Sequence, residues 1–331
     1  MYRAVRVAAA GPPSVLQTGA LPLASLRPGA HEVLIRVRAI GVNPVETYIR
    51  SGNYAQVPPY PFTPGGDCAG DVVEVGPGVT GVAPGDAVYT LRTLSGAYAE
   101  YTLAAAAAVR RVPAGLDYAH AAALPTPYYT AFRALFQRLR VRAGRCILVH
   151  GATGGVGVAA VQLARAAGLT VIGSAGSDAG AALLRRWCHA VVRHGEGAAT
   201  VQAVRAASPG ALGVHYVLEN LANANLQLDL EVLAPMADAA VCVVGSRGDT
   251  SITPRLLMSK EATITGCMLW ATTEDEWAAA TAAIHAGLEA GTLAPVVGTT
   301  LAGLESAPAA HEEVIAHAGA GARGKVVIVL P

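Results

Sequence analysis

Hydrophobic residues follow two different patterns along the chain. In the first third, Val33, Ile35 and Val37 fall on one face of a short segment, and Arg36 and Arg38 fall on the other. This period of two residues is typical of a half-buried β-strand. Similar segments at 71–75, 86–90 and 98–103 are separated by turns that contain glycine and proline. The first third therefore predicts a compact, partly closed antiparallel β domain.

From about residue 123, apolar strands alternate with helical segments. The first strand is expected at 147–150, followed by a helix over about 155–167. Alternation of this kind predicts a doubly wound parallel sheet, with the strand order 3-2-1-4-5-6 that is typical of dinucleotide-binding domains. The further strands are expected at 170–174, 190–193, 214–219, 239–244 and 262–269.

The end of the chain is expected to return to the first domain. Thr273 and Glu276 form a capping box at the start of a helix, whose apolar residues recur at helical spacing from Trp277 to Leu288. A last strand at 325–330 would close the β domain. The sequence thus predicts an α/β protein with a β-rich domain, residues 1–122 and 266–331, and a dinucleotide-binding domain, residues 123–265.

Composition narrows the class of protein. The 331 residues are 53% hydrophobic and 5% aromatic, a balance that fits a soluble α/β protein. The sequence has no uninterrupted apolar stretch of the roughly 18 to 20 residues that a membrane-spanning helix needs, and we expect a cytoplasmic protein. The five scattered cysteines fit reduced thiols, and a net charge of +1 gives no general attraction to nucleic acid.

The clearest chemical signal is a cluster of glycines between the strand at 147–150 and the helix that follows. Residues 149–157 read Val-His-Gly-Ala-Thr-Gly-Gly-Val-Gly. Gly151 and Gly154 allow a tight turn, and Gly157 allows the helix to pack closely on the strand. Amide groups at the start of such a helix bind pyrophosphate. We interpret this segment as the pyrophosphate loop of a nicotinamide dinucleotide.

The end of the next strand bears on which coenzyme binds. Enzymes that use NAD usually hold the ribose hydroxyls with an acidic residue there, but residues 173–177 carry none. Asp178 follows, and it could face solvent at a helix start. We therefore favour NADPH over NADH, with Ser174, Ser177 and His194 as candidate donors to the 2′-phosphate. For His194, an ordinary surface position is an equally open interpretation.

The residues that would hold a catalytic zinc ion are missing. Asn43 stands where a cysteine ligand would be expected, and residues 64–67, Pro-Gly-Gly-Asp, lack the expected histidine. We expect no metal site, including at His150 and His189. Without a Lewis acid, reduction of an electrophilic acceptor is easier than oxidation of an alcohol.

These segments together resemble one family. Residues 3–7, 41–52, 96–101, the glycine cluster, 221–223 and 243–248 are similar to the zeta-crystallins, the zinc-free NADPH:quinone oxidoreductases of the medium-chain dehydrogenase/reductase superfamily. The resemblance covers nearly the whole chain. It implies a GroES-like catalytic domain beside a Rossmann domain, with the nicotinamide in the cleft between them.

The resemblance also implies roles for individual residues. Asn43 and Tyr48 would lie near the nicotinamide ribose and Thr130 near the carboxamide, which makes these three the candidate catalytic residues. The coenzyme-binding set includes Tyr48 and Thr130, with Thr153, Gly154, Gly155 and Val156 at the pyrophosphate and Gly176, Ser177 and His194 at the adenosine phosphate. Asn223 would lie at the adenine, and Gly245, Cys267, Met268 and Leu269 toward the nicotinamide. Val244, Ser246 and Arg247 complete the set.

The expected activity is NADPH-dependent reduction of a quinone stacked over the nicotinamide. Either hydride transfer or electron transfer would need mainly proximity and orientation. Tyr48 or Tyr54 would act either as a proton donor or as part of the pocket wall. An alternative is an NADPH-dependent reductase of 2-alkenals or enones. An alternative of another class is an AU-rich RNA-binding or crystallin-like structural protein, and the resemblance also implies a homotetramer or dimer.

Overall fold

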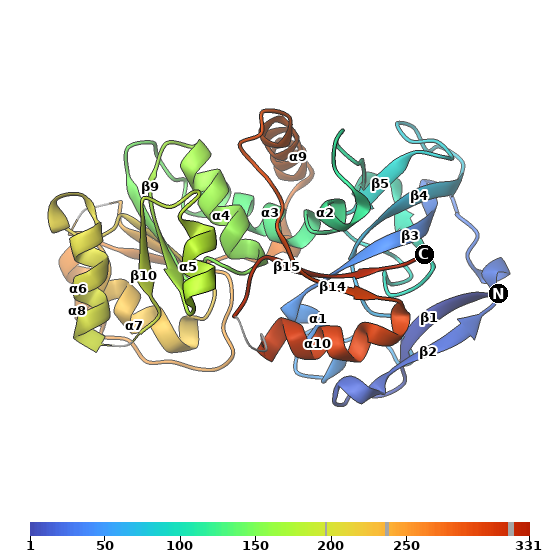
Figure 1. Cartoon of the computed structure of the whole chain (residues 1–331), viewed down its shortest axis with the longest axis horizontal. Coiled ribbons are helices and arrows are strands. Elements are labelled where there is room, and N and C mark those ends of the chain that lie inside the picture. Colours follow the sequence, from blue (N-terminus) through green and yellow to red (C-terminus); the bar gives the residue numbers. More distant parts are fainter. Residues whose placement is uncertain (196, 236–237, 317–320) are drawn as a thin grey trace. The chain divides into compact units, whose positions relative to one another are not determined.

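The computed structural model describes residues 1–195, 197–235, 238–316 and 321–331. The chain forms two compact units (Figure 1). One comprises Met1–Thr126, Pro295–Gly319 and Lys325–Pro331, and the other comprises Pro127–Ala294 and Ala320–Gly324.

The first unit is built on antiparallel strands. Its larger sheet has the order β14-β15-β3-β4-β5-β7, with β6 also pairing with β3, and only β14 and β15 run parallel. A separate ribbon pairs β1 with β2. The strands are β1 (Tyr2–Val7), β2 (Leu16–Leu21), β3 (Glu32–Val42), β4 (Asp67–Val75), β5 (Ala87–Thr90), β6 (Tyr101–Ala105), β7 (Val109–Arg111), β14 (Val297–Ala302) and β15 (Lys325–Val329).

Along β3, Val33, Ile35 and Val37 are buried and Arg36 is exposed, as predicted. The second face is not wholly polar, because Leu34 is also buried and Arg38 is half-buried and pairs with Asp71. The strand predicted at 98–103 begins three residues later. The backbone of Tyr98 donates to the carbonyl of Pro64 instead of entering the sheet. The helices of this unit are α1 (Pro44–Arg50), α2 (Tyr118–Ala122) and α10 (Ala307–Ala316), with 3-10 turns at Pro13–Val15, Leu23–Ser25, Ala106–Ala108 and Leu304–Ser306.

The second unit is a parallel sheet with the order β10-β9-β8-β11-β12-β13. This is the predicted order 3-2-1-4-5-6, which is confirmed. Leu148, Ile172, Val217 and Val241 from adjacent strands form part of its apolar core. The strands are β8 (Cys146–Val149), β9 (Thr170–Ala175), β10 (Ala190–Arg193), β11 (Tyr216–Glu219), β12 (Ala240–Val243) and β13 (Thr263–Gly266).

Helices alternate with these strands along the chain (Figure 1). They are α3 (Pro125–Phe132), which continues into a π-helical segment at Arg133–Arg138, α4 (Gly155–Ala166), α5 (Asp178–Leu184), α6 (Gly197–Ala207), α7 (Ala222–Val232), α8 (Pro254–Lys260) and α9 (Glu274–Glu289), with 3-10 turns at Pro209–Ala211 and Leu269–Ala271.

Helix α9 begins at the predicted capping box of Thr273 and Glu276. It packs against the segment that precedes β8. The hydroxyl groups of Tyr129 and Thr281 lie 2.9 Å apart, and Arg133 pairs with Glu276 at 2.5 Å. These contacts include α9 in the parallel-sheet unit, whereas the predicted domain ranges place 266–331 with the β-rich domain. The chain rejoins the antiparallel unit at Pro295.

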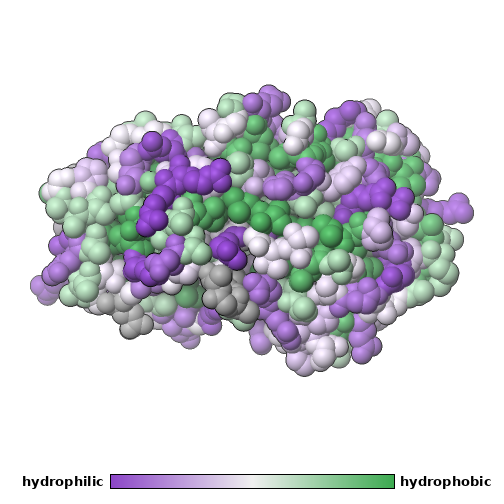
Figure 2. Space-filling model, viewed as in Figure 1, coloured by the Kyte–Doolittle hydropathy of each residue, from purple (hydrophilic) through white to green (hydrophobic). Residues whose placement is uncertain are grey.

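In the part of the chain that the structure describes, no helix is both long and apolar enough to cross a membrane. On the face drawn in Figure 2, hydrophilic residues are interspersed with hydrophobic ones.

Candidate functional site

The glycine cluster forms a tight turn between β8 and α4. Gly151 has a φ of +56°, and Gly154 is extended and caps the helix. A β-carbon on Gly157 would lie 2.2 Å from the carbonyl oxygen of Gly151, so only glycine allows the helix to approach the turn this closely. The first amide groups of α4 have no partner within the helix. They form the kind of helix start that binds a phosphate group.

The predicted coenzyme residues of this unit are brought to one edge of the parallel sheet. Each group follows the carboxyl end of a strand, which is where open α/β sheets bind their ligands. Thr130 is the exception, because it lies on α3. The groups are Thr153–Val156 after β8, Gly176 and Ser177 after β9, His194 after β10, Asn223 after β11, Val244–Arg247 after β12, and Cys267–Leu269 after β13.

Several of these residues contact one another. The side-chain oxygen of Asn223 accepts a hydrogen bond of 2.8 Å from the backbone of Arg247. The thiol of Cys267 lies 3.9 Å from the carbonyl oxygen of Thr130. These contacts join the turn after β11 to the turn after β12, and α3 to the segment after β13.

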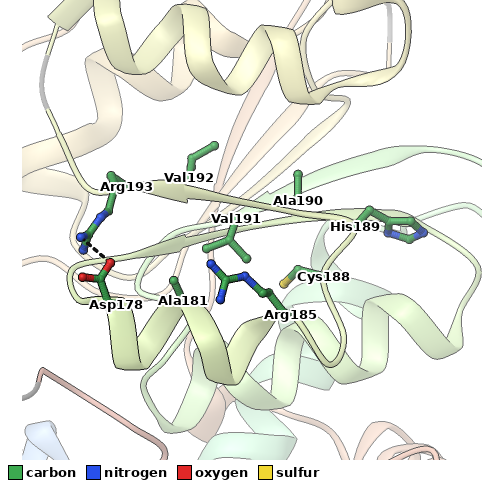
Figure 3. A pocket seen from close by; sticks show the side chains of 9 residues that line it. All are labelled: Asp178, Ala181, Arg185, Cys188, His189, Ala190, Val191, Val192 and Arg193. Atoms are coloured by element: carbon green, nitrogen blue, oxygen red, sulfur yellow. Dashed lines mark hydrogen bonds and ion pairs between the residues drawn. The ribbon is translucent and has the colours of Figure 1, made fainter.

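The end of β9 differs in part from the prediction. Ser174 is buried under the turn, where its hydroxyl accepts the backbone N–H of Gly151 at 3.2 Å, so it supports the loop rather than facing a ligand. Ser177 caps α5. Asp178 is exposed, as expected, and pairs with Arg193 at 2.7 Å (Figure 3). Burial and the neighbouring His150 lower the pKa of His194.

Two arginines near this edge were missed from the sequence. Arg193 directly precedes His194. It pairs with Asp178 and so balances the negative charge of the one acid at the start of α5. Arg323 is exposed and comes from the chain end. The backbone of Gly324 donates to the carbonyl of Thr153 at 2.6 Å, so this segment runs beside the glycine turn. Only the position of Arg193 next to His194 could have revealed either arginine in advance.

A hollow of 360 Å³ lies along α5 and β10 (Figure 3). Its walls include Arg185, Cys188 and the pair of Asp178 and Arg193. None of the predicted coenzyme residues lines it. The pair of Asp178 and Arg193, which adjoins Ser177 and His194, is the point at which the hollow borders the coenzyme edge.

In the antiparallel unit, Asn43 lies in a buried polar network. Asn43 caps α1, and its side chain donates to Asp67 at 2.9 Å and to Glu46 at 3.2 Å. The ammonium group of Lys325 donates to the side-chain oxygen of Asn43 and, at 3.0 Å, to Asp67. Lys325 is only 4% exposed. The network fixes the orientation of the Asn43 amide and places a positive charge beside it.

The network continues from Glu46 into the unit. The hydroxyl of Tyr98 donates to Glu46 at 2.7 Å, and His311 lies 3.1 Å from that hydroxyl. Burial, with a further contribution from Asp67, raises the pKa of Glu46 to about 7. Burial also raises the pKa of Tyr98 and lowers that of His311 to about 3. Tyr48 lies on α1, as Glu46 does, and is half-buried.

Lys325 was also missed from the sequence. It is one of two lysines in the chain, the other being Lys260. A lone lysine at the start of an apolar strand is a weak sign of a buried cation, and it does not identify Asn43 or Asp67 as its partners.

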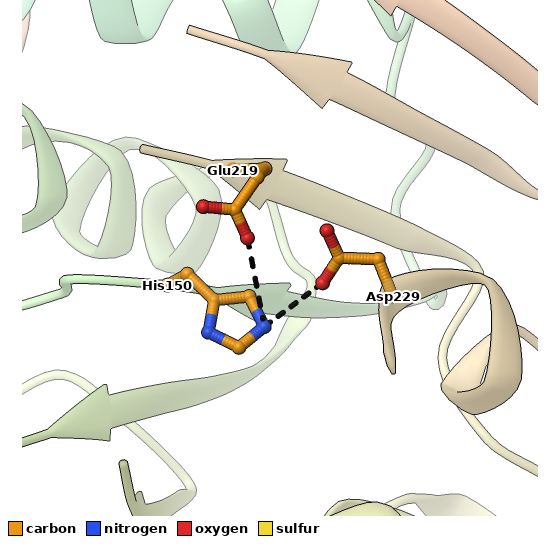
Figure 4. A group of neighbouring side chains, drawn as sticks. All are labelled: His150, Glu219 and Asp229. Atoms are coloured by element: carbon orange, nitrogen blue, oxygen red, sulfur yellow. Dashed lines mark ion pairs between the residues drawn. The ribbon is translucent and has the colours of Figure 1, made fainter. Parts of the chain in front are cut away.

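A second buried cluster lies in the parallel-sheet unit (Figure 4). His150 follows β8, Glu219 ends β11, and Asp229 lies on α7, with side chains that are at most 7% exposed. The Nε2 atom of His150 is 2.9 Å from Asp229 and 3.8 Å from Glu219. No sequence pattern predicts this cluster, because its members are far apart along the chain.

Together, the antiparallel unit and a doubly wound sheet with a phosphate-binding turn define a two-domain dehydrogenase or reductase that uses a nicotinamide dinucleotide. Residues 29–114 match the family model of the alcohol dehydrogenase GroES-like domain, and residues 155–286 match that of the zinc-binding dehydrogenases. The predicted GroES-like and Rossmann folds are confirmed.

Comparison with known proteins defines the family more closely. The whole chain is 45% identical to the quinone oxidoreductase of Homo sapiens and covers 98% of that protein. Among solved structures, mycobacterial Rv1454c complexed with NADPH is 29% identical with a TM-score of 0.89, and covers 99% of this chain and 100% of its own. The quinone oxidoreductase of Pseudomonas syringae pv. Tomato is 26% identical with a TM-score of 0.86, at the same coverage. The chain belongs to the quinone oxidoreductase family of the medium-chain dehydrogenase/reductase superfamily, and it is an oxidoreductase.

Proposed function

We propose that this protein reduces quinones with NADPH and without a metal ion. The observation that carries the proposal is the glycine turn at the sheet edge, in a chain that matches human quinone oxidoreductase over its whole length. When bound, NADPH supplies the hydride. In a two-electron transfer, the reaction consumes NADPH, a proton and a quinone, and yields NADP⁺ and a hydroquinone.

Several features support NADPH as the coenzyme. The backbone after β9 passes through Gly176 and Ser177 without an acidic residue, and Asp178 is paired with Arg193. His194 and Arg323 add a polar and a cationic group nearby. A 2′-phosphate would meet donors here rather than a carboxylate. The related mycobacterial structure was also solved with NADPH.

In this proposal Tyr48 lies beside the nicotinamide ribose and the acceptor, and Thr130 lies beside the carboxamide. Asn43 acts with them through its position, because its amide is held by Lys325 and Asp67. Lys325 places its ammonium group beside Asn43, which stands where a zinc-dependent dehydrogenase would have a cysteine ligand. Hydride transfer then depends on orientation more than on acid catalysis.

Steady-state oxidation of NADPH by phenanthrenequinone tests the role of Tyr48. We expect Tyr48→Ala to lower kcat/KM on the order of tenfold, with an unchanged unfolding temperature. Tyr48→Phe separates its two candidate roles. It keeps the rate if the ring forms the pocket wall and loses it if the hydroxyl donates a proton. Unchanged kinetics for Tyr48→Ala would remove this residue from the site.

The metal-free part of the proposal has its own test. Prolonged dialysis against a chelator should leave the quinone reductase rate unchanged, with a zinc-dependent alcohol dehydrogenase as the positive control. Loss of rate that added zinc restores would contradict it.

Assays of NADPH oxidation with phenanthrenequinone and with a medium-chain 2-alkenal compare quinone reduction with the enone reductase alternative, which the relatives do not favour.

We further propose, from the family resemblance alone, that the protein is a cytoplasmic homotetramer or dimer, which sedimentation would measure. Binding to AU-rich RNA, the candidate from another class, has weak support, because 24 basic residues are balanced by 23 acidic ones. A gel shift with and without NADPH would show whether such RNA competes for the coenzyme site.

A further inference from the structure

Three buried ionisable side chains lie beneath the edge of the parallel sheet that carries the coenzyme turns (Figure 4). The side chains of Glu219 and Asp229 are 0% exposed, and that of His150 is 7% exposed. Groups of this kind are costly to bury unless they are paired or neutralised. None of them belongs to the proposed hydride chemistry, so their burial calls for another role.

His150 connects the cluster to the turn after β8 and to the end of β9. Its ring lies 3.4 Å from the hydroxyl of Ser174, which in turn accepts the N–H of Gly151. Its carbonyl oxygen accepts a hydrogen bond of 2.8 Å from the side chain of Asn220. A shift of His150 would therefore move the first residue of the glycine turn and the turn after β11.

Glu219 connects the cluster to the turns after β11 and β12. One carboxylate oxygen accepts the N–H of Leu221 and, at 3.2 Å, the side chain of Asn225. Its carbonyl oxygen accepts the N–H of Val244 at 2.8 Å. Gly245 then packs so tightly on Asn220 that a β-carbon there would lie 2.6 Å from the carbonyl oxygen of Asn220.

The other ends of the three side chains converge. Among the described residues, none makes a hydrogen bond of good geometry to Nε2 of His150, to the second oxygen of Glu219 or to either oxygen of Asp229. One ring nitrogen of His150 and one carboxylate oxygen from each of Glu219 and Asp229 all lie within 4.8 Å of one another. Nearly all buried polar atoms in folded proteins have partners. Protons shared among the three side chains would give these atoms their hydrogen-bond partners.

We propose that His150, Glu219 and Asp229 are positioning residues that together hold the end of β9 and the turns after β8, β11 and β12 in the shape that binds the coenzyme. This inference rests on the proposed function, because it concerns the same coenzyme edge. This role requires no contact between the three residues and the coenzyme. They act through Gly151, Ser174, Asn220 and Leu221.

The cluster supports the coenzyme-binding turns in a way that depends on pH, because its charge state changes with pH. Burial, together with the neighbouring Asp229, raises the pKa of Glu219 to about 7, and burial raises that of Asp229 to about 8. Burial lowers the pKa of His150. His194, after β10, is the further titratable group that interacts with His150. The carboxyl groups hold their protons below these pKa values. As pH rises through about 7 to 8, two buried carboxylates would repel each other beneath the turns.

The Asp229→Asn variant tests the proposal, because it keeps the shape of the side chain and cannot ionise. Calorimetric titration with NADPH would give Kd at several values from about pH 6 to about pH 9. In the wild type we expect Kd to rise on the order of tenfold across this range, since one unit of pKa shift corresponds to a tenfold change. Asp229→Asn should hold Kd constant to within about threefold. The exposed acid Asp275 gives the matched control, and Asp275→Asn should follow the wild type.

A second variant separates positioning from general stability. Asp229→Ala removes the cluster's hydrogen-bonding capacity, and we expect it to raise KM for NADPH on the order of tenfold while kcat at saturating NADPH stays within about twofold. Equal losses in kcat and in kcat/KM, or parallel pH profiles for wild type and Asp229→Asn, would overturn the proposal. Stoichiometric zinc or manganese in the purified wild type that is absent from Asp229→Asn would also overturn it, by making the cluster a metal site. A wild type that binds no NADPH at any pH would instead reject the proposed function.

Discussion

At the scale of single residues, Glu46 shows how one buried acid makes the stability of the fold depend on pH. It is 5% exposed and accepts hydrogen bonds from Tyr98 and Asn43, and its pKa lies near 7 rather than 4.5. The folded state therefore keeps a proton that the unfolded chain has already lost. Stability must then fall as pH rises from about 4.5 to about 7.

The Glu46→Gln variant removes this titration. In chemical denaturation at a series of pH values, the free energy of unfolding of the wild type should fall across that window by up to about 3 kcal/mol more than that of the variant. The difference between the two curves isolates Glu46 from the acids of the parallel-sheet unit. Glu274→Gln, at an exposed position, is the control. Curves that run parallel would show that Glu46 is ionised throughout.

Single residues also mark the limit of prediction from sequence. Asn43 was singled out because it replaces a cysteine ligand, but nothing local connects it with Lys325, which is far away in sequence. His150 stands inside the glycine cluster, yet its partners Glu219 and Asp229 become neighbours only when β8 and β11 pair and α7 packs beside them. Patterns of a few residues carry no information about such contacts.

At the scale of the elements, the turn between β8 and α4 depends on Gly157. A β-carbon there would lie 2.2 Å from the Gly151 carbonyl oxygen and 2.5 Å from the Cα of Ala152, both of which are backbone atoms. A flexible side chain could move aside, but backbone in a tight turn cannot do so without changing the turn. The helix and the turn must therefore separate in any larger variant.

We expect Gly157→Ala to weaken NADPH binding by at least about tenfold, which is about 1.4 kcal/mol, because it displaces the amide groups that hold the pyrophosphate. Isothermal titration with NADPH measures this loss. The control is Gly19→Ala in β2, where a β-carbon meets nothing within 4 Å. If both variants bind NADPH as the wild type does, the glycine turn does not hold the coenzyme.

Elements with local signals were predicted well. The capping box of Thr273 and Glu276 fixes the start of α9 within a few residues, so it is visible in the sequence. The strand predicted at 98–103 begins later, at Tyr101, because Tyr98 bonds to the distant loop at Pro64. The packing of α9 on the helix before β8 depends likewise on the side chains of Tyr129 and Arg133, which no periodicity reveals.

At the scale of the whole molecule, coenzyme binding is linked to folding. A ligand that binds only the folded protein stabilises it by about 2.7 kcal/mol at a concentration of 100 Kd. NADPH and NADH differ only in the 2′-phosphate, so the difference between their effects on thermal unfolding reports the groups that meet this phosphate. His194, the cation of Arg323 and the pair of Arg193 with Asp178 are the candidates.

We expect NADPH to raise the unfolding temperature more than NADH does at equal concentration, and Arg323→Ala to reduce that difference. The arginine places a positive charge beside the glycine turn, where it can pair with the 2′-phosphate of NADPH. NADH lacks this phosphate. Removal of the arginine should therefore weaken NADPH binding on the order of threefold to tenfold and leave NADH binding almost unchanged. Thermal scans over a series of coenzyme concentrations measure both effects. Arg255→Ala, at an exposed position on α8, is the matched control. Equal weakening of both coenzymes would place Arg323 at the pyrophosphate, and a preference for NADH in the wild type would refute the assignment of the coenzyme.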